Sequence, residues 1–306
     1  MENVVTPIQE IHCQQNNRIF IKRDDLLPFS FGGNKARKAV EFLEDIRANK
    51  CDTVVTYGSS SSNHCRIIAN MARANGMSCF IISPQEDYVE TVNSKLIQML
   101  GAQIIMTPVD QVGETISKTM KELEATCKPY FIQGGGHGNL GTKAYVKAYN
   151  EICEYEREHN IKFDYIFLAS GTGTTQAGLV CGKILNNSDT KIVGISIARR
   201  NPRGKQVVVD SVNEYMASLG FAKDYSDQVE FLDDYILDGY GKYNDEIDQT
   251  IQKVLINYGI PLNRTYTGKA FWGMEKYLEN IENKNILFIH SGGTPLFFDY
   301  LRGERG

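Results

Sequence analysis

The sequence predicts an α/β protein built from two doubly wound, mostly parallel sheets. Short apolar runs alternate with segments whose apolar residues recur at helical spacing, from Ile19 to Gly293. Repeated alternation of strands and helices is typical of parallel sheets covered by helices on both faces. The length of 306 residues and the hydrophobic fraction of 42% are sufficient for two packed domains.

The individual elements follow from local pattern and are predicted in chain order. The predicted strands are IFIKR (19–23), TVVTYG (53–58), CFIIS (79–83), QIIMTP (103–108), YFIQGG (130–135), YIFLAS (165–170), KIVGISIA (191–198) and ILFIHSGG (286–293). The helices between them are predicted at residues 39–50, 64–76, 92–101, 114–126, 142–156 and 174–185, and further long helices flank a loop rich in Gly and Tyr, GYGKY (239–243).

We expect a larger domain formed by residues 1–38 and 145–306 and a smaller α/β domain formed by residues 39–144. The helical stretch 145–159 is expected to lead the chain from one domain to the other. Four strand-to-loop junctions are rich in Gly, Ser or Thr: GSSSSNH, GGGHGNLG, GTGTTQAG and SGGTP. Ligands bind beyond the carboxyl ends of strands in such sheets, so we expect a ligand in the cleft between the domains.

Bulk composition excludes several classes of protein. The net charge of −4 gives no basic face for a nucleic-acid partner. No apolar run approaches the length of a bilayer, and the N-terminal segment lacks the pattern of a signal peptide, so we expect no membrane and a cytoplasmic location. The seven cysteines are scattered without a CxxC pair and the five histidines form no ligand-spaced cluster, which predicts neither a disulfide framework nor a metal site.

The segment SGTGTTQAGL (170–179) joins a predicted strand to a predicted helix. Glycine backbone N–H groups and a helix N-terminus favour an anion, and the hydroxyls of Thr172, Thr174 and Thr175 add donors around Gly171 and Gly173. The segment lacks the Gly-Lys-Ser/Thr ending of a P-loop and the placement of a dinucleotide fingerprint. The remaining interpretations are a phosphate site and a glycine-rich turn that only begins a helix.

Lys35 stands in GGNKARK, directly after two glycines and at the start of a predicted helix. A helix start favours negative charge, so a lysine there is either a solvated residue or one held for chemistry. A lysine, a phosphate loop and a Ser-Gly-Gly turn together suit pyridoxal 5'-phosphate, which needs a Schiff-base amine, a phosphate site and a partner for its pyridine nitrogen. We therefore expect pyridoxal phosphate as the cofactor, with Lys35 buried and its pKa lowered.

The chain resembles the fold-type II pyridoxal-phosphate enzymes of the D-cysteine desulfhydrase and 1-aminocyclopropane-1-carboxylate (ACC) deaminase family. The resemblance is carried, in order, by IFIKRDD, GGNKARK, SNH, GTGTTQAG, GYGKYNDE, YTGKA and ILFIHSGGTP. It implies the tryptophan synthase β-like fold, a small amino-acid substrate and a homodimer.

The resemblance also implies roles for individual residues. Lys35, Tyr266 and Ser62 are the implied catalytic residues, with Lys35 joined to the cofactor and Tyr266 at the reacting face. The implied cofactor-binding residues are Lys35, Asn63, Gly171, Thr172, Gly173, Thr174, Thr175 and Ser291. The implied substrate-binding residues are Ser61, Ser62, Asn63, His64 and Tyr266. Arg37 and Lys38 are expected to be ordinary surface charges.

Two positions distinguish the branches of this family. The deaminase branch has YEGK and HLGG, whereas this sequence has Thr267 in YTGK and Ser291 in HSGG, as in the desulfhydrase branch. Two segments depart from the family pattern. Ser59, Ser60 and Ser61 give a more polar lining before Ser62, and Arg264 is interpreted either as a fixed cation beside the pocket or, preferably, as a solvated side chain.

These observations predict a pyridoxal-phosphate dependent lyase that carries out α,β-elimination on D-cysteine. The alternatives are an ACC deaminase, a related lyase or racemase acting on another β-substituted amino acid, and an amino-acid-binding protein that has kept the fold without the chemistry. The presence of Lys35, Ser62 and Tyr266 together argues against the last alternative.

Overall fold

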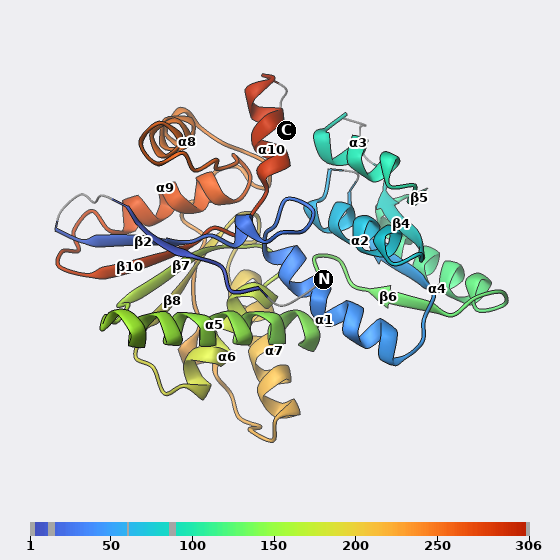
Figure 1. The fold of residues 1–306 in the computed structure, drawn as a ribbon, viewed down its shortest axis with the longest axis horizontal. Coiled ribbons are helices and arrows are strands. Elements are labelled where there is room, and N and C mark those ends of the chain that lie inside the picture. Colours follow the sequence, from blue (N-terminus) through green and yellow to red (C-terminus); the bar gives the residue numbers. More distant parts are fainter. Residues whose placement is uncertain (1–3, 12–15, 60, 86–89, 304–306) are drawn as a thin grey trace.

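The computed structural model describes residues 4–11, 16–59, 61–85 and 90–303. It contains two separate sheets that lie side by side with a helix, α1 (Asn34–Ala48), between them (Figure 1). The first sheet has six strands and the second has four. Within the described residues, no helix is both long enough and apolar enough to span a membrane.

The six-stranded sheet is parallel except at one edge. Its order is β1 (Ile8–Ile11), β2 (Arg18–Lys22), β10 (Asn285–Ile289), β7 (Tyr165–Ser170), β8 (Lys191–Ser196) and β9 (Glu230–Leu232), and only β1 runs antiparallel to its neighbour. Alternate residues of β7 serve the two faces: Ile166 and Leu168 join one core, whereas Phe167 and Ala169 join the other. This period of two is the geometry of a strand that is buried on both faces.

Helices cover both faces of the six-stranded sheet (Figure 1). One core is closed by α5 (Asn139–His159), α6 (Thr174–Leu185) and α7 (Arg203–Ser218), and the other by α8 (Asp245–Tyr258) and α9 (Thr267–Tyr277). Three short 3₁₀ helices, Asp24–Leu26, Val109–Gln111 and Ser226–Gln228, lie in the connections.

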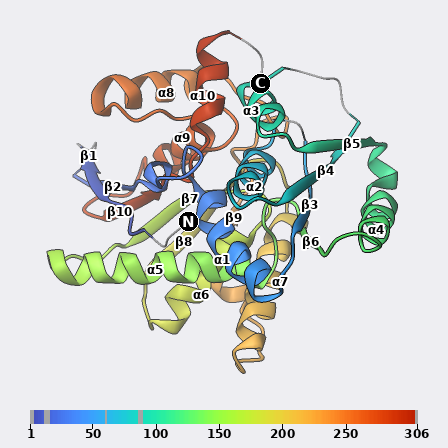
Figure 2. The ribbon, with the colours of Figure 1, turned by 45° about the vertical axis from the view of Figure 1, so that its right-hand side comes forward.

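The four-stranded sheet is parallel throughout, in the order β5 (Gln103–Thr107), β4 (Ser78–Pro84), β3 (Thr53–Tyr57) and β6 (Pro129–Ile132). Its core is formed with α1, α2 (Asn63–Ala74) and α3 (Val92–Met99), while α4 (Val112–Leu123) packs against β4 and β6. The last helix, α10 (Thr294–Leu301), packs against α3, as both views show (Figures 1 and 2).

The sequence prediction of two mostly parallel, doubly wound sheets is confirmed. It missed β1, β9 and α10, which are short elements of four, three and eight residues. Short edge strands carry too little periodicity to be separated from loops. The predicted domain boundaries, 1–38 with 145–306 against 39–144, stay a prediction; the two sheets take their strands from residues 8–22 with 165–289 and from residues 53–132.

Candidate active site

A pocket of about 610 Å³ lies between the two sheets. Its walls come from residues that end or follow β3, β4 and β6 of one sheet and β7, β8 and β10 of the other, so both sheets present their carboxyl ends to it. The sequence-predicted residues that line it are Lys35, Ser62, Asn63, His64, Gly171, Thr172, Gly173, Thr175, Tyr266 and Ser291. Ser61 and Thr174 are not among the lining residues.

Lys35 enters this pocket from the first turn of α1, which is tied to the Ser291 turn. The Asn34 N–H donates to the Ser291 carbonyl at 2.9 Å. Gly33 has φ +96°, and an added Cβ would lie 2.7 Å from the Ser291 oxygen, so only glycine allows this approach. Desolvation lowers the pKa of Lys35 to about 8. The neutral, nucleophilic form of this amine is therefore more abundant near neutral pH than that of an ordinary lysine.

The expectation that Arg37 and Lys38 are surface charges is wrong. Arg37 is 5% exposed and Lys38 1% exposed, because α1 packs between α5 and α2 instead of lying on the surface. Lys38 donates from Nζ to the Thr174 hydroxyl at 2.6 Å. The one-turn spacing from Lys35 thus brings a second buried lysine to the start of α6, and burial lowers its pKa well below the usual value.

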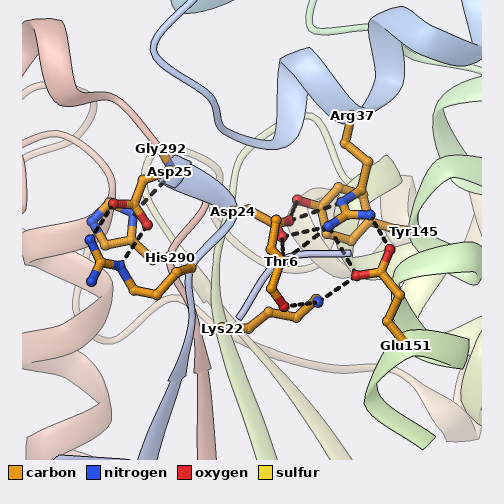
Figure 3. A network of polar contacts seen from close by, with 10 residues as sticks. Thr6, Lys22, Asp24, Asp25, Arg37, Tyr145, Glu151, His290 and Gly292 are labelled. Carbon is orange, nitrogen blue, oxygen red and sulfur yellow. Dashed lines mark hydrogen bonds and ion pairs between the residues drawn. The ribbon is translucent and has the colours of Figure 1, made fainter. Parts of the chain in front are cut away.

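Arg37 belongs to a buried charge network at the base of α1 (Figure 3). Its guanidinium binds Asp24 at 2.7 Å and Glu151 at 2.5 Å, and Lys22 binds Glu151 at 2.6 Å. The Tyr145 hydroxyl donates to Asp24 at 2.6 Å. Burial alone would raise the pKa of Asp24, but Arg37 and Lys22 lower it to about 2. Two cations and two carboxylates balance here, and the network fixes the helix that carries Lys35.

The GTGTT loop presents the start of α6 to the pocket. Gly173, with φ +96°, precedes the helix, and no side chain of the described residues caps it. The first N–H groups of a helix lack partners within the helix and attract anions. Asn34 Nδ2 donates to the Thr175 hydroxyl at 3.0 Å. Lys38 adds a buried amine, which donates to the Thr174 hydroxyl at the start of the same helix. This donor set fits a phosphate dianion.

Three buried polar atoms of the lining support a polar ligand. The Ser170 hydroxyl, the Nδ1 atom of His137 and the Oε1 atom of Gln176 have no hydrogen-bond partner in the described part of the chain. Unpaired buried polar atoms cost free energy unless a ligand or water satisfies them. The pocket residues, the phosphate-binding loop and the lowered pKa of Lys35 together fit pyridoxal phosphate.

A family model described as pyridoxal-phosphate dependent enzyme matches residues 2–292. The chain belongs to this family. A putative ACC deaminase from Pyrococcus abyssi is 31% identical over 303 residues, covering 96% of this chain and 91% of the relative. A D-cysteine desulfhydrase from Yersinia enterocolitica is 31% identical over 312 residues, covering 96% of this chain and 93% of the relative.

The crystal structure of an ACC deaminase homologue superposes on this chain with a TM-score of 0.87 at 31% identity, covering 98% of this chain and 93% of that one. These findings confirm the resemblance drawn from the sequence, the two-domain fold type II architecture and pyridoxal phosphate as the cofactor. The protein is a pyridoxal-phosphate dependent lyase of the D-cysteine desulfhydrase and ACC deaminase family.

In this member of the pyridoxal-phosphate dependent family, the SNH segment begins α2 at the pocket wall. The Ser62 hydroxyl accepts hydrogen bonds from the His64 and Cys65 N–H groups at 3.1 and 3.4 Å and so caps the helix. His64 is 3% exposed and its Nε2 lies 2.8 Å from the Thr56 hydroxyl, which itself donates to Ile132. His64 Nε2 therefore carries the proton, and burial lowers the pKa of His64 well below its usual value.

The family's late tyrosine, Tyr266, has a partner that the sequence prediction missed. The hydroxyl oxygens of Tyr240 and Tyr266 lie 2.5 Å apart, and both residues line the pocket. Tyr240 belongs to the GYGKYNDE motif, which carries part of the family resemblance, but no role was predicted for this tyrosine. Its loop is held by buried Lys269, whose Nζ donates to the Ile236 and Gly239 carbonyls at 3.0 and 3.1 Å.

Of the two hydroxyls that distinguish the branches of the family, only Ser291 lines the pocket. Thr267 is fully buried behind it, where its Oγ1 accepts from the Asn263 backbone N–H and from Asn263 Nδ2, both at 3.0 Å. No aspartate or glutamate is present among the described lining residues. Ser291 therefore brings a neutral hydroxyl residue, and no carboxylate, to this part of the described wall.

Both interpretations of Arg264 are wrong. Its guanidinium makes two 2.7 Å hydrogen bonds to Asp248 and lies over the rings of Tyr243 and Tyr300, at 3.9 and 4.5 Å from their centroids. Its side chain is 19% exposed and does not line the pocket. Arg264 therefore joins α8 to α10 and contributes no charge to the site.

Proposed function

We propose that this protein catalyses α,β-elimination on D-cysteine, giving pyruvate, ammonia and sulfide with consumption of one water. The observation that carries the proposal is the neutral Ser291 hydroxyl on a pocket wall without a described carboxylate. Relatives of about equal identity are named D-cysteine desulfhydrase and putative ACC deaminase, so the names of relatives support the two chemistries equally. Ser291 favours the first.

Pyridoxal phosphate, when bound, supplies the electron sink that makes the Cα proton of an amino acid acidic. A carboxylate beside the pyridine nitrogen would keep that ring protonated and the carbanion long-lived. A hydroxyl does not enforce protonation, which suits prompt loss of a β-leaving group. Opening of the cyclopropane ring of ACC has no such leaving group and demands a more persistent carbanion.

We assign the chain's residues to this chemistry as follows. Lys35 binds the cofactor and exchanges the Cα proton through its Nζ atom. At the start of α2, the Ser62 hydroxyl and Asn63 supply donors for the substrate carboxylate, while His64, whose N–H groups are bonded to Ser62 and Thr56, lines the same wall. Tyr266, held by Tyr240, stands ready to protonate the leaving thiolate. Ser61 and Thr174 position their neighbours from behind the wall, since Asn93 Nδ2 donates to the Ser61 carbonyl and Lys38 to the Thr174 hydroxyl.

ACC deaminase activity is the second candidate, because a relative of the same identity is named for it. A related lyase or racemase on another β-substituted amino acid, and a silent amino-acid-binding protein, remain alternatives in the same pocket. We also propose two domains with the boundaries predicted from the sequence, a homodimer and a cytoplasmic location. The scattered cysteines, none of which is paired by the structure among the described residues, support a reducing compartment.

The test is release of pyruvate and ammonia from a panel of D- and L-amino acids with β-leaving groups and from ACC. We expect turnover of D-cysteine, sulfide as the third product, and slow or no turnover of ACC. Lys35→Ala serves as the inactive control. Faster consumption of ACC than of every β-substituted amino acid would overturn the branch assignment, and no turnover by a protein that binds the cofactor would support the silent binding protein. Light scattering tests the dimer.

A further inference from the structure

We propose that Asn93, a residue outside the pocket, is a positioning residue that fixes the orientation of the Asn63 amide. Asn63 lines the pocket at the first position of α2, whereas Asn93 lies in the first turn of α3, is fully buried and does not line the pocket. The inference rests on the cofactor-binding role that the family resemblance implies for Asn63, which we include in the proposed function.

The hydrogen-bond partners of Asn93 allow only one orientation of its side-chain amide. Its Nδ2 donates to the Ser61 carbonyl at 2.8 Å and to Asn63 Oδ1 at 2.9 Å. A backbone carbonyl can only accept, so the Ser61 oxygen requires the NH₂ group of Asn93 on this side. That same NH₂ group faces Asn63, and the atom of Asn63 that meets it must be the acceptor Oδ1.

A second donor reinforces this orientation. Arg66, one helical turn after Asn63, lies 3.5 Å from the same Oδ1 atom through Nη2, and a guanidinium has no acceptor. With its oxygen directed at Asn93 and Arg66, Asn63 directs its NH₂ group to the opposite side. There Nδ2 lies beside Gly293, where an added Cβ would be 3.4 Å away, next to the turn that contains Ser291.

The orientation of the Asn63 amide decides whether this side chain attracts or repels an anionic oxygen of the cofactor. An NH₂ group on the Gly293 side of Asn63 can donate to an anionic oxygen bound there, such as the phenolate of a pyridoxal ring, whereas a flipped amide would present its carbonyl oxygen and repel it. The Oδ1 atom of Asn93 has no hydrogen-bond partner in the described part of the chain. Asn93 thus leaves its own acceptor unpaired, at a cost in free energy, while both partners on its donor side are satisfied.

Helix α3 is itself fixed from the other half of the molecule. Its N-terminus is closed by a capping box between Thr91 and Ser94, and the Val92 N–H donates to Asp299 Oδ1 at 2.9 Å. Asp299 is 2% exposed and belongs to α10, which begins directly after the Ser291 turn and packs on α3 (Figures 1 and 2). The helix that follows Ser291 therefore holds the helix whose Asn93 orients Asn63.

The test is a double-mutant cycle on the full-length protein. For each variant, the affinity for pyridoxal phosphate is measured by absorbance titration, and KM and kcat are measured separately. We expect Asn93→Ala to weaken cofactor affinity about three- to tenfold, the range of one uncharged hydrogen bond. In the Asn63→Ala background the same change should have little effect, because the residue through which it acts is gone. Asn93→Asp should cost more than Asn93→Ala, since a carboxylate forces Asn63 to flip.

Asn75→Asp is the matched control. Asn75 also donates to a backbone carbonyl, that of Met71 at 2.8 Å, but lies at the other end of α2, so its change should leave cofactor affinity unaltered. Should Asn93→Ala fail to fold, Asn93→Ser, judged by its melting temperature, carries the same cycle. Equal losses with and without Asn63 would overturn the inference. If Asn63→Ala itself binds the cofactor as wild type does, it is instead the proposed role of Asn63 that fails.

Discussion

The hydroxyl oxygens of Tyr240 and Tyr266 are 2.5 Å apart, and their rings meet edge to face with centroids separated by 6.0 Å. Burial, followed by the neighbouring phenol of Tyr240, raises the pKa of Tyr266 well above its usual value. Tyr266 is therefore neutral at physiological pH, as the proton donor of the proposed elimination has to be. Tyr240 is 55% exposed, so the pair connects this donor to solvent.

Tyr266→Phe should lower kcat for elimination from D-cysteine by about 10²–10⁴-fold, the usual contribution of a general acid or base, while cofactor affinity is retained. Tyr240→Phe should cost less, because Tyr266 keeps its own hydroxyl. Steady-state kinetics together with cofactor titration check both. Tyr243→Phe, in the same loop but outside the pocket lining, is the control. A Tyr266→Phe enzyme with wild-type kcat would remove Tyr266 from the reaction.

Lys35→Ala should leave the protein folded but unable to bind pyridoxal phosphate covalently, and borohydride should attach the cofactor of the wild type to Lys35. Because the pKa of Lys35 is about 8, the neutral amine becomes more abundant as the pH rises towards that value. The rate of cofactor uptake by the apoprotein should therefore rise up to about pH 8 and then level off. Lys269 is a built-in control, since burial also lowers its pKa to about 8 away from the pocket. Labelling of Lys269 or Lys38 would contradict the assignment.

Gly173→Val should weaken cofactor affinity far more than Thr175→Val. Gly173 has φ +96°, a conformation unfavourable for a β-branched residue, and an added Cβ would lie 3.2 Å from Val207 Cγ1. Thr175→Val removes one hydroxyl, and a hydrogen bond to a charged group is worth about 1.5–3 kcal/mol. Titration of each apoprotein with pyridoxal phosphate measures the difference. Equal affinity of wild type and Gly173→Val would exclude the loop from the phosphate site.

Ser291→Ala should lower the rate of elimination, because a ring nitrogen in a dry site loses a hydrogen bond worth about 1–3 kcal/mol. Thr267→Val is the informative contrast. Thr267 bonds to Asn263 and does not line the pocket, so its replacement should lower the melting temperature and largely preserve kcat. Loss of kcat in Thr267→Val together with an unchanged kcat in Ser291→Ala would contradict the assignment of Ser291 as the partner of the ring nitrogen.

Arg37→Leu should lower the free energy of unfolding of the apoprotein by about 3–5 kcal/mol at pH 7, because Asp24 and Glu151 are left as buried charges without this partner. The folded-state pKa of Asp24 is about 2, below its ordinary 3.8, so the contribution of its ion pair is present above pH 3.8 and is lost as the pH falls through about 2. Urea unfolding at several pH values checks both statements. The exposed Arg73→Leu should change stability by less than about 0.5 kcal/mol. If Arg37→Leu lowered the free energy of unfolding no more than Arg73→Leu does, the charge network would be dispensable for stability.

The sequence by itself determined the alternation of strands and helices and the motifs that meet at the pocket. Strand and helix periods are local properties, and so are the glycines that allow the chain to turn at Gly33 and Gly173. In a parallel sheet every strand delivers its carboxyl end to one edge, so glycine-rich loops after strands converge without further information. This argument covers SNH, the GTGTT loop and the Ser291 turn, whereas Lys35 was predicted from its place after two glycines and Tyr266 from the resemblance to the family.

Only the tertiary structure decided which charged and polar residues are buried, and against what. Arg37 pairs with Glu151, 114 residues away, and Asn63 is oriented by Asn93, 30 residues away on another helix. Local sequence pattern predicts that a charged residue is solvated. Here the free-energy cost of burying these residues is offset by partners that only the fold brings near. The same reason separates Ser291 from Thr267: their motifs are equally polar in sequence, but packing places Ser291 in the pocket wall and turns the Thr267 hydroxyl towards Asn263.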